Sequence, residues 1–284
     1  MAPRTAGMPA RPSTVVLVES VVSPADGTRI VYRTFPCDSG DEAAPAVLMS
    51  HGTALSQAIW RGFGYVRALT HTHRVITVDL RGHGRSEGPH QASAYGLDSF
   101  VADLVAVLDK TGTPTADYVG YSLGGRVGFS LAAAHPERLH RFVSIAGAAS
   151  TVRGTFDRVF FPGCIATLEE EGMDGFLRGW QAHTGAPLDA ATRHAFSAND
   201  PVALAAYMSR AEEDPGVDDE TLKRFDIPTQ MIVGSLDLER VTTALHVHEV
   251  LPDAQLLVVD GATHGTILRE PRTLETVTGF LAPV

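Results

Sequence analysis

Short apolar runs that end in glycine or in polar residues recur along the chain. The first of them, Arg29–Phe35, alternates between apolar and polar residues, which predicts a strand near a sheet edge. The later runs are almost continuously apolar, as in strands of a parallel sheet that are buried on both faces. They are Ala46–Gly52, Arg74–Leu80, Ala116–Ser122, Arg141–Gly147, Thr229–Ser235 and Ala254–Gly261.

Helical patterns separate these runs. In residues 97–112, apolar side chains recur three and four positions apart, and Gly112 marks the end of the predicted helix. Two further helices are predicted over residues 123–139 and 270–281. Because strands and helices alternate, the sequence predicts an α/β fold with a mostly parallel, doubly wound sheet.

One long stretch, residues 150–225, interrupts this alternation because it is helical, more charged and without a clear strand. It is either a long, partly helical connection or a helical cap inserted over the C-terminal edge of the sheet. We favour the cap, since compact domains rarely contain so long a loop without structure. The predicted organisation is a flexible tail over residues 1–13, a core over 14–149 and 226–284, and a cap over 150–225.

Composition limits the partners. The 284 residues carry a formal net charge of -10, which argues against a nucleic-acid or anionic-membrane partner because phosphate binding needs a basic patch. No apolar stretch reaches transmembrane length and the N-terminal residues form no convincing secretion signal, so we expect a soluble cytoplasmic protein. Cys37 and Cys164 are expected to be free thiols. A homodimer is compatible with the sequence but has no specific signal in it.

The candidate nucleophile is Ser122, which lies between Gly120 and Gly124 where a predicted strand turns into a helix. The pattern G-x-S-x-G fixes only three positions and settles nothing alone. At a sharp strand-to-helix turn, however, small neighbours avoid collision, and the helix start supplies free N–H groups and a positive dipole end. A serine hydroxyl is a weak nucleophile and needs a base.

Among the 12 histidines, His264 is the best candidate base, since it follows an apolar run on a short loop before the last helix. His71 and His73 could face the same way, but no third metal ligand accompanies them, so we expect no metal site. The acid that orients the base is expected to be Asp237, with Glu239 as an obvious competitor and Asp260 as a weaker one.

An oxyanion site needs fixed hydrogen-bond donors, and backbone N–H groups serve well because they need no reorganisation. Leu123, directly after the candidate nucleophile, offers one N–H group. Thr53, after the tight turn at His51 and Gly52, offers the other. All these candidates follow the C-terminal ends of strand runs, where open α/β sheets build their sites. The chain order Ser, Asp, His is the order that such a triad follows on this kind of sheet.

With these five segments in this order, "HGTALSQAIW", "DLRGHGRS", "GYSLGG", "VGSLD" and "GATHGTILREP", the chain resembles the α/β-hydrolase superfamily of serine hydrolases. The resemblance covers almost everything outside the predicted cap. It implies Ser122 as nucleophile, Asp237 as acid and His264 as base, with Thr53 and Leu123 as the oxyanion hole. In the family, "DLRGHGRS" is mainly a structural loop.

Several local features argue against particular branches of this superfamily. "HGTALS" lacks the glycine run of the lipase branch, and Gly265 stands where a bulkier residue is common. A serine nucleophile argues against haloalkane dehalogenases and epoxide hydrolases, which use a carboxylate. Tyr121 in "GYSLGG" is unlike the asparagine typical of hydrolases that cleave carbon–carbon bonds, which lowers that interpretation without excluding it.

The substrate pocket is expected between core and cap. Trp60, Tyr121 and Leu238 are candidate pocket residues because they neighbour the predicted machinery. The apolar cap residues are expected mostly to pack the cap onto the core, with a minority touching substrate. They are Phe160, Phe161, Phe176, Trp180, Tyr207 and Met208, of which Phe161, Trp180 and Met208 are the candidates for substrate contact. Arg178 and Arg210 could bind a substrate carboxylate, although a solvated helix face is the commoner role.

The function hypothesis is a cofactor-independent serine hydrolase of small carboxylic esters or lactones, acting through an acyl-enzyme on a small-molecule substrate. One alternative is another enzyme with the same machinery: a C–C bond hydrolase, a perhydrolase-like enzyme or an acyltransferase. The other alternative is a ligand-sensing protein with little turnover, because a fold alone does not fix a function.

Overall fold

An eight-stranded sheet forms the centre of the molecule in the computed structural model, which describes residues 18–151 and 153–283. The predicted tail, residues 1–13, lies outside the described residues. The strand order is β1-β2-β4-β3-β5-β6-β7-β8. The strands are β1 (Val18–Val22), β2 (Arg29–Phe35), β3 (Ala46–Ser50), β4 (Arg74–Asp79), β5 (Ala116–Tyr121), β6 (Leu139–Ile145), β7 (Thr229–Gly234) and β8 (Gln255–Val259).

The predicted α/β fold is confirmed. Strand β2 runs antiparallel to both of its neighbours, and the strands from β4 to β8 are all parallel. Strands β3, β5 and β7 are buried along their whole length, as their continuous apolar runs predict. Strand β8 is different. It pairs only with β7 and is partly exposed, with Val258 at 42%, so burial on both faces was a wrong expectation for this edge strand.

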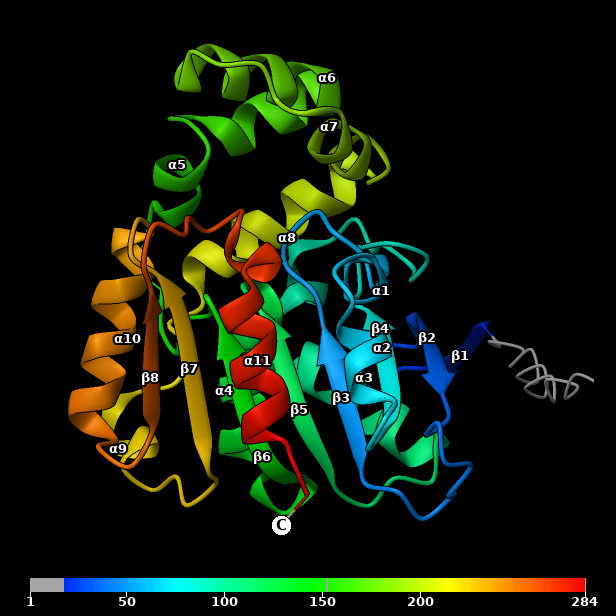
Figure 1. Cartoon of the computed structure of the whole chain (residues 1–284). Helices are drawn as coiled ribbons and strands as arrows, with labels where there is room; N and C mark the ends of the chain where they lie inside the picture. The colour runs from blue at the N-terminus through cyan, green and yellow to red at the C-terminus, as the bar shows by residue number, and fades with distance from the viewer. Residues whose placement is uncertain (1–17, 152, 284) are drawn as a thin grey trace, which may run out of the picture.

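Helices cover both faces of the sheet and define two apolar cores (Figure 1). One core includes residues of α3 (Leu97–Lys110), α4 (Leu123–Ala134) and α10 (Leu238–Val250). The other includes residues of α1 (Ala58–Gly62), α2 (Tyr65–Leu69) and α11 (Pro271–Phe280). Short 3-10 turns, η1 (Ala92–Tyr95), η2 (Pro136–Arg138) and η3 (Ile267–Arg269), complete the connections. Cys37 and Cys164 are both buried free thiols.

The segment between β6 and β7 carries the remaining helices. They are α5 (Thr155–Val159), α6 (Cys164–Thr184), α7 (Ala190–Ser197), α8 (Pro201–Glu213) and α9 (Asp219–Leu222). Helices α5 to α8, here called the inserted helices, lie over the C-terminal ends of the parallel strands, whereas α9 packs beside α10 (Figure 1). Aromatic rings of α6 and α7 pack together, with Trp180 and Phe196 5.1 Å apart. No helix among the described residues is long and apolar enough to cross a membrane.

Candidate active site

Ser122 occupies a strained turn between β5 and α4. Its backbone angles are φ 52° and ψ -109°, and a residue other than glycine at positive φ costs about 1–3 kcal/mol. Two backbone hydrogen bonds hold the turn. Ser122 N–H donates to the Ile145 carbonyl at 2.9 Å, and Gly124 N–H donates to the His51 carbonyl at 3.0 Å. The hydroxyl is thereby presented at the C-terminal edge of the sheet, directly before a helix.

The two glycines of G-x-S-x-G are required by close backbone approaches. A Cβ atom on Gly120 would lie 2.2 Å from the Gly124 carbonyl oxygen. A Cβ atom on Gly124 would lie 2.1 Å from the carbonyl oxygen of Ser50 in β3. Any side chain at either position would therefore push β5 and α4 apart, or α4 and β3. The sequence suggested that the neighbours of Ser122 must be small, and these close backbone approaches are the reason.

The imidazole of His264 bridges the serine and an aspartate. Its Nε2 atom lies 2.9 Å from Ser122 Oγ, and its Nδ1 atom lies 2.6 Å from Asp237 Oδ2. His264 lies on the loop after β8, and Asp237 is the residue before α10, just past the end of β7. The Tyr121 hydroxyl donates to the His264 carbonyl at 2.8 Å, which holds the histidine loop against β5. This geometry lets a carboxylate orient an imidazole that accepts the serine proton.

The competing carboxylates lie elsewhere. Glu239 Oε1 accepts a hydrogen bond from Thr155 Oγ1 at 3.3 Å and also lies 3.3 Å from Arg240 Nη1. Asp260 Oδ1 accepts a hydrogen bond from the Ser235 hydroxyl at 3.3 Å. Among the three candidate acids, Asp237 is therefore the one whose carboxylate contacts the His264 ring.

Two backbone N–H groups flank the serine. The N–H group of Leu123 belongs to the first turn of α4, and the N–H group of Thr53 belongs to the turn after β3. Neither donates to an acceptor among the described residues. Gly52 is packed so tightly beside the serine that a Cβ atom on it would lie 3.1 Å from Ser122 Cβ. The N–H groups of Leu123 and Thr53 therefore belong to two turns that meet beside Ser122.

The segment "DLRGHGRS" forms the end of β4 and the loop after it, and buried polar contacts hold this loop. Asp79 accepts hydrogen bonds from the Gln57 backbone N–H at 2.7 Å and from the Arg85 N–H at 3.1 Å. His83 is fully buried, its Nδ1 lies 2.9 Å from the Arg81 carbonyl, and burial lowers its pKa to about 3. Burial also lowers the pKa of His51. Both imidazoles therefore stay neutral and act as packed parts of the loops around the site.

A cavity of about 390 Å³ opens onto Ser122 beneath the inserted helices. Tyr121 and Trp180, two of the predicted pocket residues, line it together with Thr53, Leu123 and His264. Its wall is mostly apolar. The other apolar lining residues include Leu55, Ile59, Phe63, Phe156, Val159, Phe160, Phe196 and Leu268.

Four residues predicted to touch substrate lie away from this cavity. Trp60 is fully buried in the core that includes α1, α2 and α11, where its ring packs edge-on against Tyr65. Leu238 is 73% exposed because α10 begins there and turns its side chain to solvent. Phe161 and Met208 are buried inside the packing of the inserted helices and do not line the cavity wall. Sequence neighbourhood and apolarity therefore identified only Tyr121 and Trp180 of the lining.

Comparisons with known proteins identify the family of this fold. Residues 45–231, well over half of the chain, match the family model of the alpha/beta hydrolase fold. The chain belongs to the α/β-hydrolase family. A Bacillus subtilis (strain 168) relative, provisionally named a 2-succinyl-6-hydroxy-2,4-cyclohexadiene-1-carboxylate synthase, is 24% identical over 277 residues, which cover 93% of this chain and 98% of the relative.

Two solved structures are similar over nearly their whole length. The enol-lactonase from Burkholderia xenovorans LB400 superposes with a TM-score of 0.78 at 23% identity, covering 93% of this chain and 100% of that one. The esterase RhEst1 from Rhodococcus sp. ECU1013 superposes with a TM-score of 0.75 at 28% identity, covering 93% and 98%.

Polar groups in the cavity of this α/β hydrolase were missed by sequence reasoning. Arg126 lies one helical turn after Ser122 on α4, a spacing that places both on one face and could have revealed it. Its Nη1 donates to the Ala211 carbonyl at 3.1 Å, and its Nη2 donates to the Asp214 carbonyl. Glu212 and Arg240 also line the cavity.

The arginines that the sequence suggested are elsewhere in the fold. Arg178 is exposed and pairs with Glu171 at 2.8 Å. Arg210 lies 3.7 Å from Asp214 and does not line the cavity. Within the described part of the chain, no group of three or more His, Cys, Asp or Glu residues could hold a metal ion.

Proposed function

We propose that this α/β hydrolase is a serine hydrolase of small carboxylic esters or lactones that works without a cofactor. The observation that carries the proposal is the continuous contact from Ser122 Oγ through His264 to Asp237 at the floor of an apolar cavity. Serine hydroxyls are activated by a neighbouring base, and the base is oriented by a carboxylate.

In the proposed acylation step, Ser122 Oγ attacks the substrate carbonyl carbon while its proton moves to His264 Nε2. The carbonyl oxygen becomes an oxyanion, which accepts hydrogen bonds from the Thr53 and Leu123 N–H groups. Asp237 accepts the hydrogen bond from Nδ1–H and stabilises the imidazolium. The proton on Nε2 then passes to the leaving alkoxide as the carbon–oxygen bond breaks, which leaves an acyl ester on Ser122.

Water completes the proposed cycle. It gives a proton to His264 Nε2 and attacks the acyl carbon, and the collapse of the second tetrahedral intermediate returns the proton to Ser122 Oγ and releases the acid. The predominantly apolar wall of the cavity suits an uncharged ester or lactone, because an apolar site binds such a group at little desolvation cost.

The relatives support the reaction class without fixing the substrate. An esterase and an enol-lactonase share the fold over nearly the whole chain. A relative provisionally named as a synthase is similar in sequence over 93% of this chain. The bond that is cleaved is therefore the part of the proposal that an experiment must decide.

The deciding experiment is hydrolysis of p-nitrophenyl esters from acetyl to octanoyl, and of simple lactones, by the wild type and by Ser122→Ala. Labelling by a fluorophosphonate probe is measured in parallel. We expect turnover and labelling in the wild type and the loss of both in Ser122→Ala. Labelling without turnover of any ester or lactone would reject this substrate class, and the absence of labelling would reject the serine mechanism itself.

A further inference from the structure

The turn that carries the proposed oxyanion donor Thr53 has a conformation that its own sequence disfavours. The Leu55 N–H donates to the Gly52 carbonyl at 3.2 Å, so Thr53 and Ala54 are the two central residues of a tight turn. Ala54 has φ 58°. Turns with positive φ at this position normally use glycine, because a Cβ atom makes that conformation unfavourable. Something outside the turn must therefore hold it.

Two side chains hold the turn by hydrogen bonds, and both come from the segment that contains α8. The Asn199 Nδ2 group donates to the Ala54 carbonyl at 2.9 Å. The same amide also donates to the Ala195 carbonyl at 2.8 Å, at the end of α7. The Tyr207 hydroxyl lies 3.1 Å from Thr53 Oγ1. Both central residues of the turn are therefore tied to the inserted helices.

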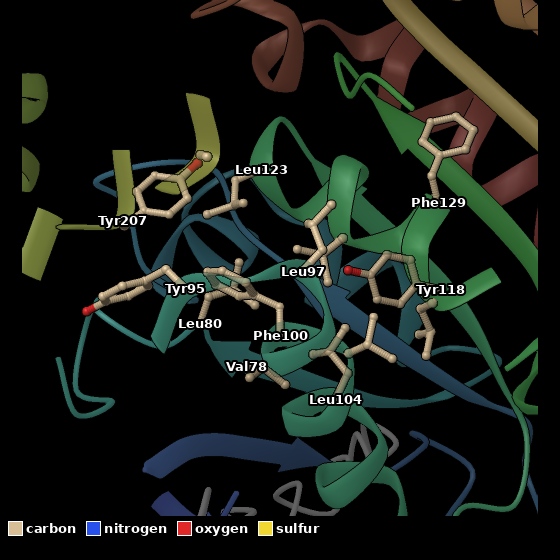
Figure 2. Close-up of a cluster of buried hydrophobic side chains, with 14 of the residues drawn as sticks. Val78, Leu80, Tyr95, Leu97, Phe100, Leu104, Tyr118, Leu123, Phe129 and Tyr207 are labelled. Carbon is tan, nitrogen blue, oxygen red and sulfur yellow. The ribbon is translucent and has the colours of Figure 1, made fainter. Parts of the chain in front are cut away.

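The anchoring side chains are themselves fixed. The Tyr207 ring is buried and packs edge-on against His83, Tyr95 and Phe100 at centroid distances of 5.4, 6.1 and 6.1 Å. Figure 2 shows Tyr207 in one cluster with Tyr95, Phe100 and Leu123. The Asp200 carboxylate next to Asn199 accepts a hydrogen bond from the Val202 N–H at the start of α8. Burial raises the pKa of Tyr207, so its hydroxyl stays protonated.

We propose that Asn199 and Tyr207 are positioning residues that hold the Thr53–Ala54 turn in its strained form and thereby complete the oxyanion site from the inserted helices. This inference rests on the proposed function. It assigns the inserted helices a part in transition-state stabilisation in addition to their part in covering the cavity. The hydrogen bonds that orient Ser122 and His264 come from Ile145, Asp237 and Tyr121 of the core. The side-chain contacts to the Thr53–Ala54 turn come instead from Asn199 and Tyr207.

The test compares Tyr207→Phe and Asn199→Ala with matched controls. Tyr95→Phe removes a hydroxyl from a neighbouring buried ring, where it donates to the Pro89 carbonyl at 2.7 Å, and does not touch the turn. Asp189→Ala removes the side-chain cap at the other end of α7, where Asp189 accepts the Thr192 N–H at 2.9 Å. Each variant is measured for kcat, KM, fluorophosphonate labelling rate and inhibition by a trifluoromethyl ketone.

We expect kcat and the labelling rate to fall roughly fivefold to tenfold in Tyr207→Phe and in Asn199→Ala, the effect of one lost hydrogen bond, with KM nearly unchanged. The trifluoromethyl ketone, whose adduct places an oxyanion in the site, should bind more weakly by the same factor. The pH at which kcat/KM is half-maximal should not move, because His264 and Asp237 are untouched. The two controls should stay within about twofold of the wild type, since neither residue contacts the turn.

A second comparison relieves the backbone strain at Ala54, whose φ is positive. Ala54→Gly in the Asn199→Ala background should recover part of kcat, because glycine adopts the positive φ without a Cβ penalty. The inference is overturned if Tyr207→Phe and Asn199→Ala behave like the controls, or if KM and inhibitor affinity change independently of kcat. A wild type that neither hydrolyses esters nor reacts with the probe would instead overturn the proposed function, and so the two failures are distinguishable.

Discussion

Asp237 and His264 are 27 positions apart in the sequence, and the carboxylate of one lies 2.6 Å from the imidazole of the other. Each residue follows one of two adjacent parallel strands, β7 and β8, so strand pairing alone brings the two loops to the same edge of the sheet. The pair is therefore fixed by sheet topology and not by any local motif.

Replacing Asp237 should separate the proposed roles of the three carboxylates. Asp237→Asn keeps the shape of the side chain but removes its charge, so we expect kcat to fall by roughly three to four orders of magnitude with the fold intact. Steady-state kinetics on a p-nitrophenyl ester, with circular dichroism as the check on folding, measures this. Glu239→Gln and Asp260→Asn are the controls and should stay within a few-fold of the wild type. A comparable loss in either control would assign the acid elsewhere.

A methyl group on Gly124 should disrupt both stability and activity. Gly124→Ala forces α4 away from the Ser50 carbonyl, and overpacking of this kind costs at least about 1–3 kcal/mol. The free energy of unfolding, measured with urea at pH 7.5, and the fluorophosphonate labelling rate should both fall. Gly279→Ala is the matched control, since nothing lies within 4 Å of its Cβ position in α11. In Gly279→Ala we expect the free energy of unfolding to rise by about 0.5–1 kcal/mol, because alanine is the better helix former.

Stability should decline on the acid side of neutrality partly because of His83. The folded protein holds the pKa of this buried group at about 3, against 6.5 for an ordinary histidine. Between these two values the unfolded chain binds a proton that the folded chain does not. The free energy of unfolding should therefore fall by about 1.4 kcal/mol per pH unit from this group as pH drops below 6.5.

The measurement is urea unfolding of the wild type and of His83→Asn at pH 7.5, 6.0 and 5.0. The variant should be less stable at pH 7.5 and should lose stability less steeply on acidification. His183→Gln replaces an exposed histidine and should leave the slope as it is in the wild type. Equal slopes in the wild type and in His83→Asn would contradict the assignment of this part of the acid sensitivity to His83.

The size of the cavity should depend on Trp180. This side chain lines the wall and packs against Phe160 and Phe196 at centroid distances of 5.0 and 5.1 Å. Trp180→Ala should shift the preferred p-nitrophenyl ester toward longer acyl chains and lower the free energy of unfolding, because the partly buried ring loses its packing against Phe160 and Phe196. Phe161→Leu also removes buried packing, but outside the cavity wall, and should leave the preferred chain length unchanged. The same shift in both variants would show that general loosening is the cause.

The strand runs were predictable because a parallel sheet buries continuous apolar segments, and the expected strand at 29–35 matches β2 residue for residue. The candidate residues Ser122, Asp237 and His264 were selectable because each follows a recognisable strand, and the fold does bring them into contact. Their catalytic roles are the proposal that the kinetic experiments test.

The cavity wall was less predictable, for a geometric reason. Trp60 and Leu238 are close in sequence to the site, but the direction of a side chain depends on where a helix begins. The Trp60 side chain is buried in the core beside Tyr65, and the Leu238 side chain is exposed to solvent. Asn199 offered no sequence signal, because its contact with Ala54 joins positions 145 residues apart. Such contacts depend on how the inserted helices pack against the sheet.

The placement of His264 beyond an edge strand has a consequence for how the protein loses activity. Strand β8 has a neighbour on one side only, whereas β5, which presents Ser122, lies between β3 and β6. Edges with few protected amides open at lower free energy than central strands. A brief detachment of β8 would carry His264, the proposed base, away while Ser122, the proposed nucleophile, remains in a fully folded centre. Heat inactivation should therefore precede the loss of overall secondary structure and should report on the opening of one strand.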